Sequence, residues 1–523
     1  MYQLKQPKNT GKYTSVSKLF MLLLIVSLTS CQDLSVQNKT APDRERALSN
    51  PGDVEKLIAS TFQDYWGRTQ TSGTSINTMP LIADEMTGTY ANNAALEMSS
   101  EPRTPYNNSP TSAAHETGRY QWYAWYAALS SANEGLGAID EGLEIIDEDD
   151  NDNTARAVGF AKFMQGVSLG YLGMIFDQAA ITDEHTDLED PASLEYKPYP
   201  QVLDASFAKL ESAIDFMENN SFTLPSDWMP GAPLTNDELA RVAYSFAARF
   251  KVYGARTPEE RQAIDWNQVI SYVDKGIVDD FNIILEWPDL YSMYLYRAQN
   301  SGSYRAHADY KLVGPADTSG AYQDWLNADL NSKEPFLIYT PDRRITAHGD
   351  TAETDGKYFR YREEGITKAE RGIYHNSYYQ WYRRSGNYWE GPHALIQKTE
   401  MDLLKAEALV RLGGDANIAE AIDLVNKTRV QNGELKPISA SGVPAGSAPV
   451  MGDGSPGSLL DAIYYERMIE LAGTDALRAY LDRRGSGTLT PGTFYQFPVP
   501  GRELQTLGLP IYTFGGGGAG SAE

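Results

Sequence analysis

Apolar residues recur at alternating steps of three and four through much of this chain, which is the spacing of an amphipathic α-helix. The longest stripe is formed by Trp122, Trp125, Leu129, Ala132, Leu136, Ile139, Leu143 and Ile146. Because residues three and four apart share one face of a helix, this stripe predicts a long helix with one buried face. Trp122 and Trp125 lie on that face, so we expect both rings in the core. The acidic run at residues 147–153 is expected to end the helix, and Thr154 to cap the next one.

The other predicted helices come in neighbouring pairs joined by short turns. They span residues 155–178, 199–218, 237–256, 265–277, 395–412, 416–432 and 459–472. Small residues stand where paired helices must approach closely, for example Gly166 and Gly170 in one helix and Ala243 in another. Such pairs are typical of tetratricopeptide-like hairpins, which stack into a curved scaffold. We therefore predict a mostly α fold with its helical scaffold at about residues 118–280 and 395–484.

A long segment between the two helical blocks, residues 281–392, has little helical periodicity. It is rich in Trp, Tyr, Gly and Asn, and its best short strand candidate is 336–339. Irregular segments of this length inside a compact protein are usually functional rather than connecting. We therefore expect a loop-rich insert that carries binding residues.

The first thirty residues have the layout of a bacterial lipoprotein signal peptide. Four lysines precede an apolar run at residues 19–28, which is too short to span a bilayer comfortably. The run leads into Leu28-Thr-Ser-Cys31, which resembles a lipobox. Cys31 is the only cysteine in the sequence, so an internal disulfide and a cysteine metal site are both excluded. We expect residues 1–30 to be removed and Cys31 to carry the acyl chains that anchor the protein to a membrane.

The charge balance disfavours one class of partner. The sequence has 45 basic and 70 acidic side chains, a formal net charge of −25. A chain this negative repels phosphate backbones, so no nucleic-acid partner is predicted. It would also not hold an anionic membrane surface by charge alone, which leaves the lipid anchor as the predicted membrane contact.

No motif predicts a catalytic residue, a cofactor site or a metal site. The Gly-Asp-Gly-Ser-Pro-Gly run at 452–457 has the spacing of a dinucleotide fingerprint, but it follows no predicted strand and contains a proline. The acidic run at 147–153 places oxygens at alternate positions, yet it lacks the glycine and the glutamate of a calcium loop, so a solvated turn is expected. The six histidines are scattered. Carboxylates are abundant enough to contain a glycosidase pair, because such a pair is defined only by its separation in space.

Passages near the carboxy terminus resemble the SusD/RagB family of Bacteroidota outer-membrane lipoproteins. Residues 400–413 and 419–429 are similar to that family's last pair of helical repeats. The sequence Glu-Arg-Met-Ile-Glu-Leu at 466–471 is similar to its Glu-Arg-x-x-Glu-Leu helix, and Phe-Pro-Val-Pro-Gly-Arg-Glu at 497–503 matches its terminal Pro-Ile-Pro-x-x-Glu element. These passages run in the family's order. The stretch at 474–484 departs from the usual Glu-Gly-x-Arg and Asp-Leu-x-Arg motifs.

This resemblance implies a fold, a location and a role. The mature chain, residues 31–523, is expected to form one SusD-like domain. Members of the family are lipid-anchored in the outer membrane and face outside the cell. They capture glycans or other nutrients and deliver them to a TonB-dependent, SusC-like barrel, and they perform no chemistry themselves. The predicted ligand is therefore an oligosaccharide or similar nutrient, the predicted partner is such a barrel, and no enzyme activity is expected.

Aromatic side chains are the candidate ligand contacts. A sugar ring presents an apolar face that a flat Trp or Tyr ring can cover, while neighbouring polar groups bond the hydroxyls at its rim. The candidates share a position in the insert or in the early mature region, and they are Trp287, Tyr291, Tyr294, Trp325, Tyr90, Trp381 and Trp389. For each ring taken alone, packing in the core is the more common role.

Two other functions stay open at this point. A glycan-degrading enzyme on a helical scaffold would release new reducing ends from a glycan. A tetratricopeptide-type assembly scaffold without a small ligand would bury the aromatic residues of the insert and expose no ring-lined cleft.

Overall fold

The computed structural model describes residues 46–71, 75–87, 94–187, 194–295, 307–347, 355–362, 377–381 and 390–516. The chain divides into two compact units, Met1–Ser49 and Asn50–Glu523. The fold described here is that of the second unit. The predicted signal peptide and Cys31 lie outside the described residues.

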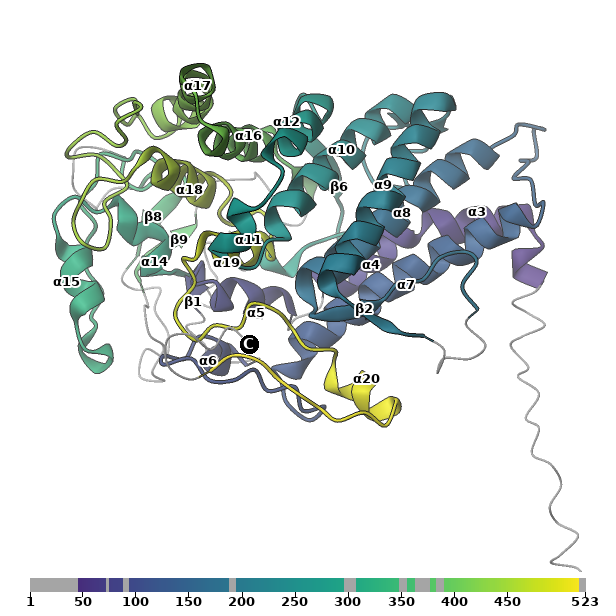
Figure 1. The fold of residues 1–523 in the computed structure, drawn as a ribbon, viewed down its shortest axis with the longest axis horizontal. Coiled ribbons are helices and arrows are strands. Elements are labelled where there is room, and N and C mark those ends of the chain that lie inside the picture. The colour runs from purple at the N-terminus through teal and green to yellow at the C-terminus, as the bar shows by residue number, and fades with distance from the viewer. Residues whose placement is uncertain are drawn as a thin grey trace, which may run out of the picture. The chain divides into compact units, whose positions relative to one another are not determined.

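The second unit is built mainly from paired helices, as the periodicity predicts. These are α7 (His115–Asp140), α8 (Thr154–Ile175), α9 (Tyr199–Asn219), α10 (Asn236–Tyr253), α12 (Trp266–Lys275), α16 (Lys398–Leu412), α17 (Asp415–Gln431) and α18 (Leu459–Glu470). Consecutive members pack against each other, and α8, α9, α10, α12, α16 and α17 follow one another in space in that order (Figure 1). The prediction of a mostly α fold with helical hairpins is confirmed.

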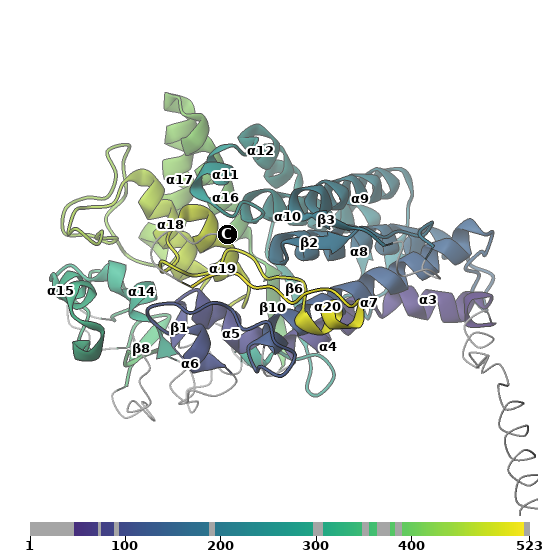
Figure 2. The same cartoon turned by 60° about the horizontal axis from the view of Figure 1, so that its bottom comes forward.

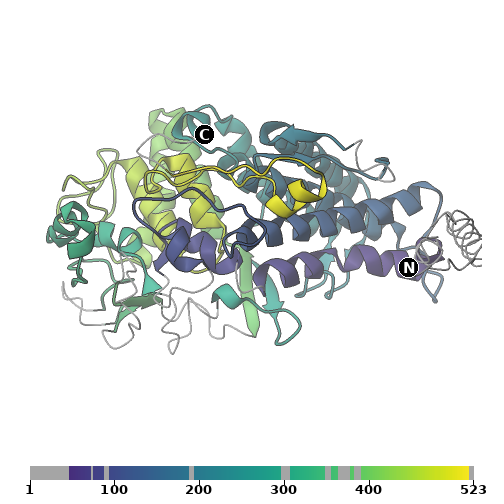
Figure 3. The ribbon, with the colours of Figure 1, turned by 90° about the horizontal axis from the view of Figure 1, so that it is seen from below.

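Shorter helices complete the scaffold, and the predicted pattern did not include them. They are α3 (Pro51–Ala59), α4 (Thr61–Gln70), α5 (Ser75–Ile82), α6 (Ala95–Met98), α11 (Pro258–Gln262), α14 (Tyr310–Val313), α15 (Ala321–Asn327), α19 (Arg478–Ser486) and α20 (Gly501–Thr506), with 3₁₀ turns η2 (Gly314–Ala316) and η3 (Leu330–Ser332). Helices α3 and α4 run along α7 (Figure 3). The signal for α3 was present, because Asn50 caps the helix by accepting a hydrogen bond from the Asp53 amide at 3.0 Å and Pro51 opens it.

The strands are short and pair two by two. They are β1 (Met86–Thr87), β2 (Gln178–Ala180), β3 (Tyr196–Pro198), β4 (Thr223–Leu224), β5 (Leu234–Thr235), β6 (Phe281–Leu285), β7 (His307–Ala308), β8 (Phe359–Tyr361), β9 (Tyr379–Trp381) and β10 (Gly391–Ile396). The antiparallel pairs are β1–β7, β2–β3, β4–β5, β6–β10 and β8–β9. The pair β6–β10 joins the start of the insert to its end.

The strand predicted at 336–339 is wrong. Its backbone amides donate hydrogen bonds to side chains rather than to a neighbouring strand. The amide of Phe336 donates to the Tyr310 hydroxyl at 2.6 Å, and the amide of Ile338 donates to the Tyr379 hydroxyl at 3.0 Å. The amide of Tyr339 donates to the Asp317 carboxylate at 2.9 Å. The segment is therefore held in an extended but unpaired form.

The helix predicted to extend to Ile146 is shorter in the structure. Helix α7 ends at Asp140, and Gly142 takes a left-handed conformation with φ of +102°. The chain then turns, so that Ile145 is buried and Ile146 is 39% exposed. Thr154 is the first residue of α8 rather than its cap, and its hydroxyl accepts the Ile145 amide at 2.8 Å.

Glycines on α8 allow its neighbours to approach closely. A Cβ atom at Gly166 would lie 2.6 Å from Leu210 of α9, and one at Gly170 would lie 2.1 Å from the ring of Phe250 of α10. Both distances are far below van der Waals contact. The predicted crossing points at Gly166 and Gly170 are confirmed.

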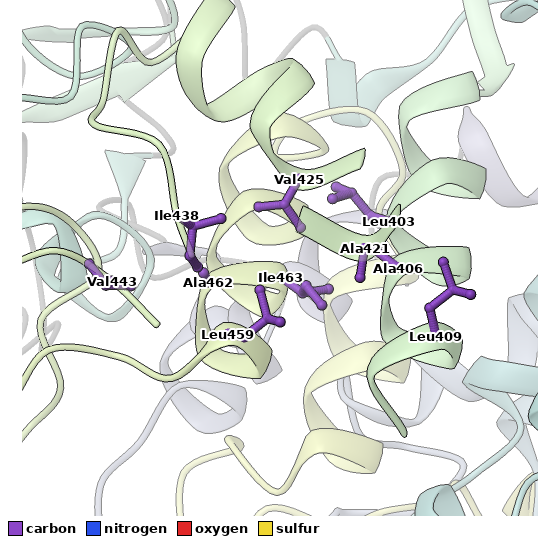
Figure 4. Packing of buried hydrophobic residues seen from close by; sticks show 10 residues of the cluster. All are labelled: Leu403, Ala406, Leu409, Ala421, Val425, Ile438, Val443, Leu459, Ala462 and Ile463. Carbon is purple, nitrogen blue, oxygen red and sulfur yellow. The ribbon is translucent and has the colours of Figure 1, made fainter. Parts of the chain in front are cut away.

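The carboxy-terminal helices share a compact apolar core. Its members come from α16, α17, α18 and the loop before α18, and they are Leu403, Ala406, Leu409, Ala421, Val425, Ile438, Val443, Leu459, Ala462 and Ile463 (Figure 4). Each is at most 6% exposed. This core fixes α18 between the helical scaffold and the insert, and Figures 1 and 2 both show α14 and α15 on the opposite side of α18 from α8 and α9.

Buried charges connect α18 to the rest of the protein. Arg467 contacts Glu407 of α16 at 2.9 Å and Asp482 of α19 at 2.7 Å. Glu466 contacts Arg344 of the insert at 2.6 Å, and Glu470 contacts the same guanidinium at 2.8 Å. Arg344 also pairs with Asp342 at 2.6 Å. Side chains that point in different directions from one helix thus join the scaffold to the insert.

Removing the shared cation of this network should destabilise the fold strongly. Arg344→Leu would leave Asp342, Glu466 and Glu470 buried without their common partner, and we expect a loss of about 3–5 kcal/mol in the free energy of unfolding. Chemical denaturation followed by circular dichroism measures this loss.

The matched control is Lys357→Met, because Lys357 and Glu434 form a solvent-exposed pair in the same part of the sequence. It should affect stability much less, since exposed pairs contribute little. Equal effects of the two substitutions would contradict a structural role for the buried network.

Candidate functional site

The predicted aromatic contacts divide by exposure. Trp287 is 50% exposed and Tyr291 is half-buried. Tyr294, Trp325 and Trp381 are buried, with exposed fractions of 1%, 6% and 1%. Tyr90 and Trp389 lie outside the described residues.

The three buried rings pack in the interior. The Tyr294 hydroxyl donates to Glu85 at 3.2 Å. Trp325 lies against the Tyr310 ring, with ring centroids 5.1 Å apart, and Trp381 lies against Phe359 at 6.1 Å. Burial leaves these rings no open face on which a sugar could stack. In this structure they are core residues.

Trp287 and Tyr291 form an exposed pair, here called the aromatic corner. Their ring centroids lie 4.5 Å apart with the planes tilted by 59°. The turn that carries them follows β6 and is closed by two hydrogen bonds between Glu286 and Leu290, at 2.7 and 2.8 Å. This closure restricts the backbone on both sides of Trp287. The aromatic corner is therefore a preformed surface.

Helix α4 holds the aromatic corner in place through two hydrogen bonds. The indole Nε1 of Trp66 donates to the Tyr291 carbonyl at 2.9 Å, and the Ser292 hydroxyl donates to Gln70 at 3.1 Å. Both partners belong to α4, so the turn is fixed to a regular element. No local sequence pattern predicts these hydrogen bonds, because more than two hundred residues separate the partners.

Stacked rings continue beneath Trp66 into the helical scaffold. Tyr65 of α4 stacks on Trp125 of α7 at 4.4 Å, and Trp125 stacks on Tyr171 of α8 at 4.2 Å with nearly parallel planes. Trp122 and Trp125 are 2% and 1% exposed, so their predicted place in the core is confirmed.

His393 connects this stack to β10. Its ring lies 6.1 Å from that of Trp66, edge to face, and its strand position is paired with Ile283 of β6. Burial lowers the pKa of His393 to about 4, against a weaker opposing effect of Asp475. The imidazole is therefore neutral at physiological pH, and charging it would disturb the base of the aromatic corner.

Acidification should weaken the fold through His393. Because the folded-state pKa lies below the ordinary value of 6.5, the unfolded chain binds this proton more tightly. The stabilisation is fully present above about pH 6.5 and is lost as the pH falls toward 4. Between pH 7 and pH 5, the wild type should lose about 2 kcal/mol more stability than His393→Asn.

Denaturant titrations of both proteins at several pH values test this difference. Other titrating groups are common to the two proteins, so the difference isolates His393. Above pH 7 the two stability curves should run parallel. Parallel curves from pH 7 down to pH 5 would contradict a buried neutral imidazole.

A second ring-lined surface was missed by the sequence analysis. A groove of about 680 Å³ between α4 and α7 is lined by Arg68, Arg119, Tyr120 and Tyr123, among others. The Arg119 guanidinium lies 4.5 Å above the Tyr120 ring, and the Tyr123 hydroxyl donates to Glu503 at 2.9 Å. Tyr120 and Tyr123 are three residues apart and offset from the buried stripe, which is the signal that could have revealed them.

The candidate metal-binding positions are occupied by other interactions. Within the described ranges, one group of three, Asp140, Glu184 and His185, brings its ligand atoms within 4.8 Å of one another. Glu184 already contacts Lys209 at 3.2 Å. In the acidic run at 147–153, the Asp147 carboxylate accepts the Asn151 amide at 2.9 Å, and these hydrogen bonds lower its pKa to about 2. Both arrangements are those of solvated turns.

No helix among the described residues is long and apolar enough to cross a membrane. Comparison with protein-family models gave no match, and comparison with curated proteins gave none either.

Solved structures, in contrast, show many matches. A SusD superfamily protein from Bacteroides vulgatus ATCC 8482 is 15% identical, and the match covers 88% of this chain and 97% of that protein with a TM-score of 0.54. A SusD superfamily protein from Bacteroides thetaiotaomicron VPI-5482 is 14% identical over 84% of this chain and 91% of its own, again with a TM-score of 0.54. A SusD-like carbohydrate binding protein from Bacteroides fragilis NCTC 9343 matches at 14% identity, over 84% of this chain and 87% of its own, with a TM-score of 0.54.

This chain has the SusD-like fold. The resemblance found in its carboxy-terminal motifs is thereby confirmed at the level of fold.

Proposed function

We propose that this protein binds an oligosaccharide, with the aromatic corner as a contact surface. The observation that carries the proposal is Trp287, whose ring is 50% exposed on a closed turn beside Tyr291. A solved relative in fold, from Bacteroides fragilis, is described as a carbohydrate binding protein. A function in glycan binding fits both the fold and the exposed rings.

The geometry suits a sugar for two reasons. An exposed indole gains free energy when an apolar sugar face covers it, and the tilted Tyr291 ring extends that surface. The exposed side chains of Glu286 and Asp289 stand on the same turn and can accept hydrogen bonds from sugar hydroxyls. Because the turn is already closed, little conformational entropy is lost on binding.

The wider role in this proposal is nutrient capture at the cell surface. The amino-terminal segment has the layout of a lipoprotein signal, and Cys31 would carry the anchor. The protein would sit in the outer membrane, face outward, and pass its ligand to a TonB-dependent, SusC-like barrel. It would act by reversible binding, without catalysis.

Removing the exposed indole should weaken glycan binding. Trp287→Ala is expected to reduce affinity for a glycan that binds the wild type by about 10- to 100-fold, or about 1.5–3 kcal/mol. Affinity electrophoresis against a panel of polysaccharides, followed by calorimetry with the best binder, measures this loss.

Tyr339→Ala is the matched control, since Tyr339 is an aromatic residue of the same insert with 42% exposure. It should bind as the wild type does. Unchanged affinity in Trp287→Ala would refute the aromatic corner as the binding surface. New reducing ends appearing during the incubation would favour the enzyme alternative.

Delivery to a barrel is tested by co-purification. The full-length tagged protein, solubilised gently from its native outer membrane, should bring a large outer-membrane barrel with it in equal amount. Cys31→Ser should appear in the soluble fraction, because it lacks the acylated thiol. A protein that purifies alone and survives protease treatment of whole cells would contradict surface capture.

A further inference from the structure

A partly open cavity lies beside α18, on the side that faces the insert. Its volume is about 200 Å³, and its walls come from α14, α15, α18, α19 and the loop at 449–452. The apolar part of the lining includes Leu312, Leu326, Met451 and Met468. The rest of the lining is polar and includes Arg478, Arg483 and the carboxylates of Glu85 and Asp482. Waters against the apolar part of the lining are readily displaced by an apolar group.

Arg483 supplies a positive charge at this cavity without a carboxylate to balance it. Its guanidinium donates to the carbonyls of Ala83, Asp84 and Thr488. Within the part of the chain that the structure describes, no carboxylate lies within ion-pair distance of Arg483. A charged guanidinium whose acceptors are all neutral carbonyls retains a strong attraction for an anion.

Arg478 adds an unused donor to the same wall. The side chain is 4% exposed, and its Nε is buried without a hydrogen-bond acceptor. Its closest acidic oxygen, on Glu85, is 3.5 Å from Nη2. Glu85 is itself occupied by the Gly473 amide at 3.1 Å and the Tyr294 hydroxyl at 3.2 Å. An unsatisfied buried donor is costly, so an acceptor placed in the cavity would relieve that cost.

The other acidic groups at the cavity are already engaged. Asp84 contacts Arg103 at 2.6 Å, and Asp482 contacts Arg467 at 2.7 Å. Asp461 accepts the Ser458 hydroxyl at 2.6 Å in the capping box of α18. Asp84 and Asp482 are thus each paired with a cation, whereas the hydrogen-bond partners of Asp461 and of Arg483 are neutral groups.

We propose that this cavity binds a small carboxylic acid with an apolar body. The hydrocarbon part would fill the space beside Leu312, Leu326 and Met468, and the carboxylate would accept hydrogen bonds from Arg483 and from Arg478 Nε. An adjoining groove shares Lys311 and Leu326 with the cavity. This site is distinct from the aromatic corner, because none of its lining residues belongs to the turn after β6.

Three probes of the same shape test the proposal: phenylpropionate, phenylpropanol and phenylpropylamine. Binding to the purified mature protein is measured by saturation-transfer NMR and calorimetry. Phenylpropionate should bind at least about tenfold more tightly than phenylpropylamine, because the cavity offers a cation to the carboxylate. Equal affinity for the acid and the amine, or no binding of any probe, would overturn the proposal.

Variants assign the binding to this cavity. Arg483→Gln should lower the affinity for phenylpropionate by about tenfold and leave that for phenylpropanol unchanged, while Arg483→Lys should recover part of the loss. Leu326→Trp should fill the cavity and abolish binding of both compounds.

Arg68→Gln serves as the control, since Arg68 lines the separate groove between α4 and α7. Thermal unfolding shows that each variant is folded before its affinity is compared. If Leu326→Trp is folded and binds phenylpropionate like the wild type, the ligand is elsewhere and the proposal fails. None of these outcomes depends on glycan binding at the aromatic corner.

Discussion

The buried charges of α18 join the helical scaffold to the insert. Successive side chains on a helix point about 100° apart, so Glu466 and Glu470 face the insert while Arg467 faces α16 and α19. Burial alone would raise the pKa of Glu407, but Arg261 and Arg467 beside it hold that pKa well below its usual range. The carboxylates of this network lie against guanidinium groups, which is the condition under which buried ions are tolerated. This arrangement explains the Glu-Arg-x-x-Glu spacing at residues 466–470.

The contacts that attach the insert to α18 and to β10 determine which binding surfaces the insert can present. Because Arg344 ties the middle of the insert to α18 and the β6–β10 pair ties its two ends, the segments between them are fixed at several points. The turn after β6 is left at the surface with Trp287 exposed, and the space between α14, α15 and α18 is left as a partly open cavity. An open ring surface suits a large ligand that must be released, whereas a cavity with an apolar wall and two arginines suits a small acid. The two proposed sites differ in ligand for this physical reason.

Periodicity found helices such as α9 and α12 because each buries one apolar face, which is written locally in the sequence. The sequence pattern led to a wrong prediction where side chains distant in the sequence accept the hydrogen bonds of backbone amides. Residues 336–339 resemble a strand, but the hydroxyls of Tyr310 and Tyr379 take the place of a partner strand. The helix predicted to reach Ile146 stops at Asp140, where Gly142 adopts a left-handed conformation. Short helices such as α4 are too brief for a stripe to stand out, although α4 supports the aromatic corner.

The sequence by itself determined the helical scaffold, the burial of Trp122 and Trp125, and the carboxy-terminal motifs that resemble the SusD/RagB family. Only the tertiary structure decided which aromatic residues of the insert keep an exposed face. Trp287, Trp325 and Trp381 all belong to the insert, yet one is half exposed and two are buried. Exposure depends on contacts with residues far away in the chain, such as Arg344 with Glu466 across 122 positions, and these contacts leave no local pattern. The cavity beside α18 follows the same rule, because its walls come from segments that only folding brings together.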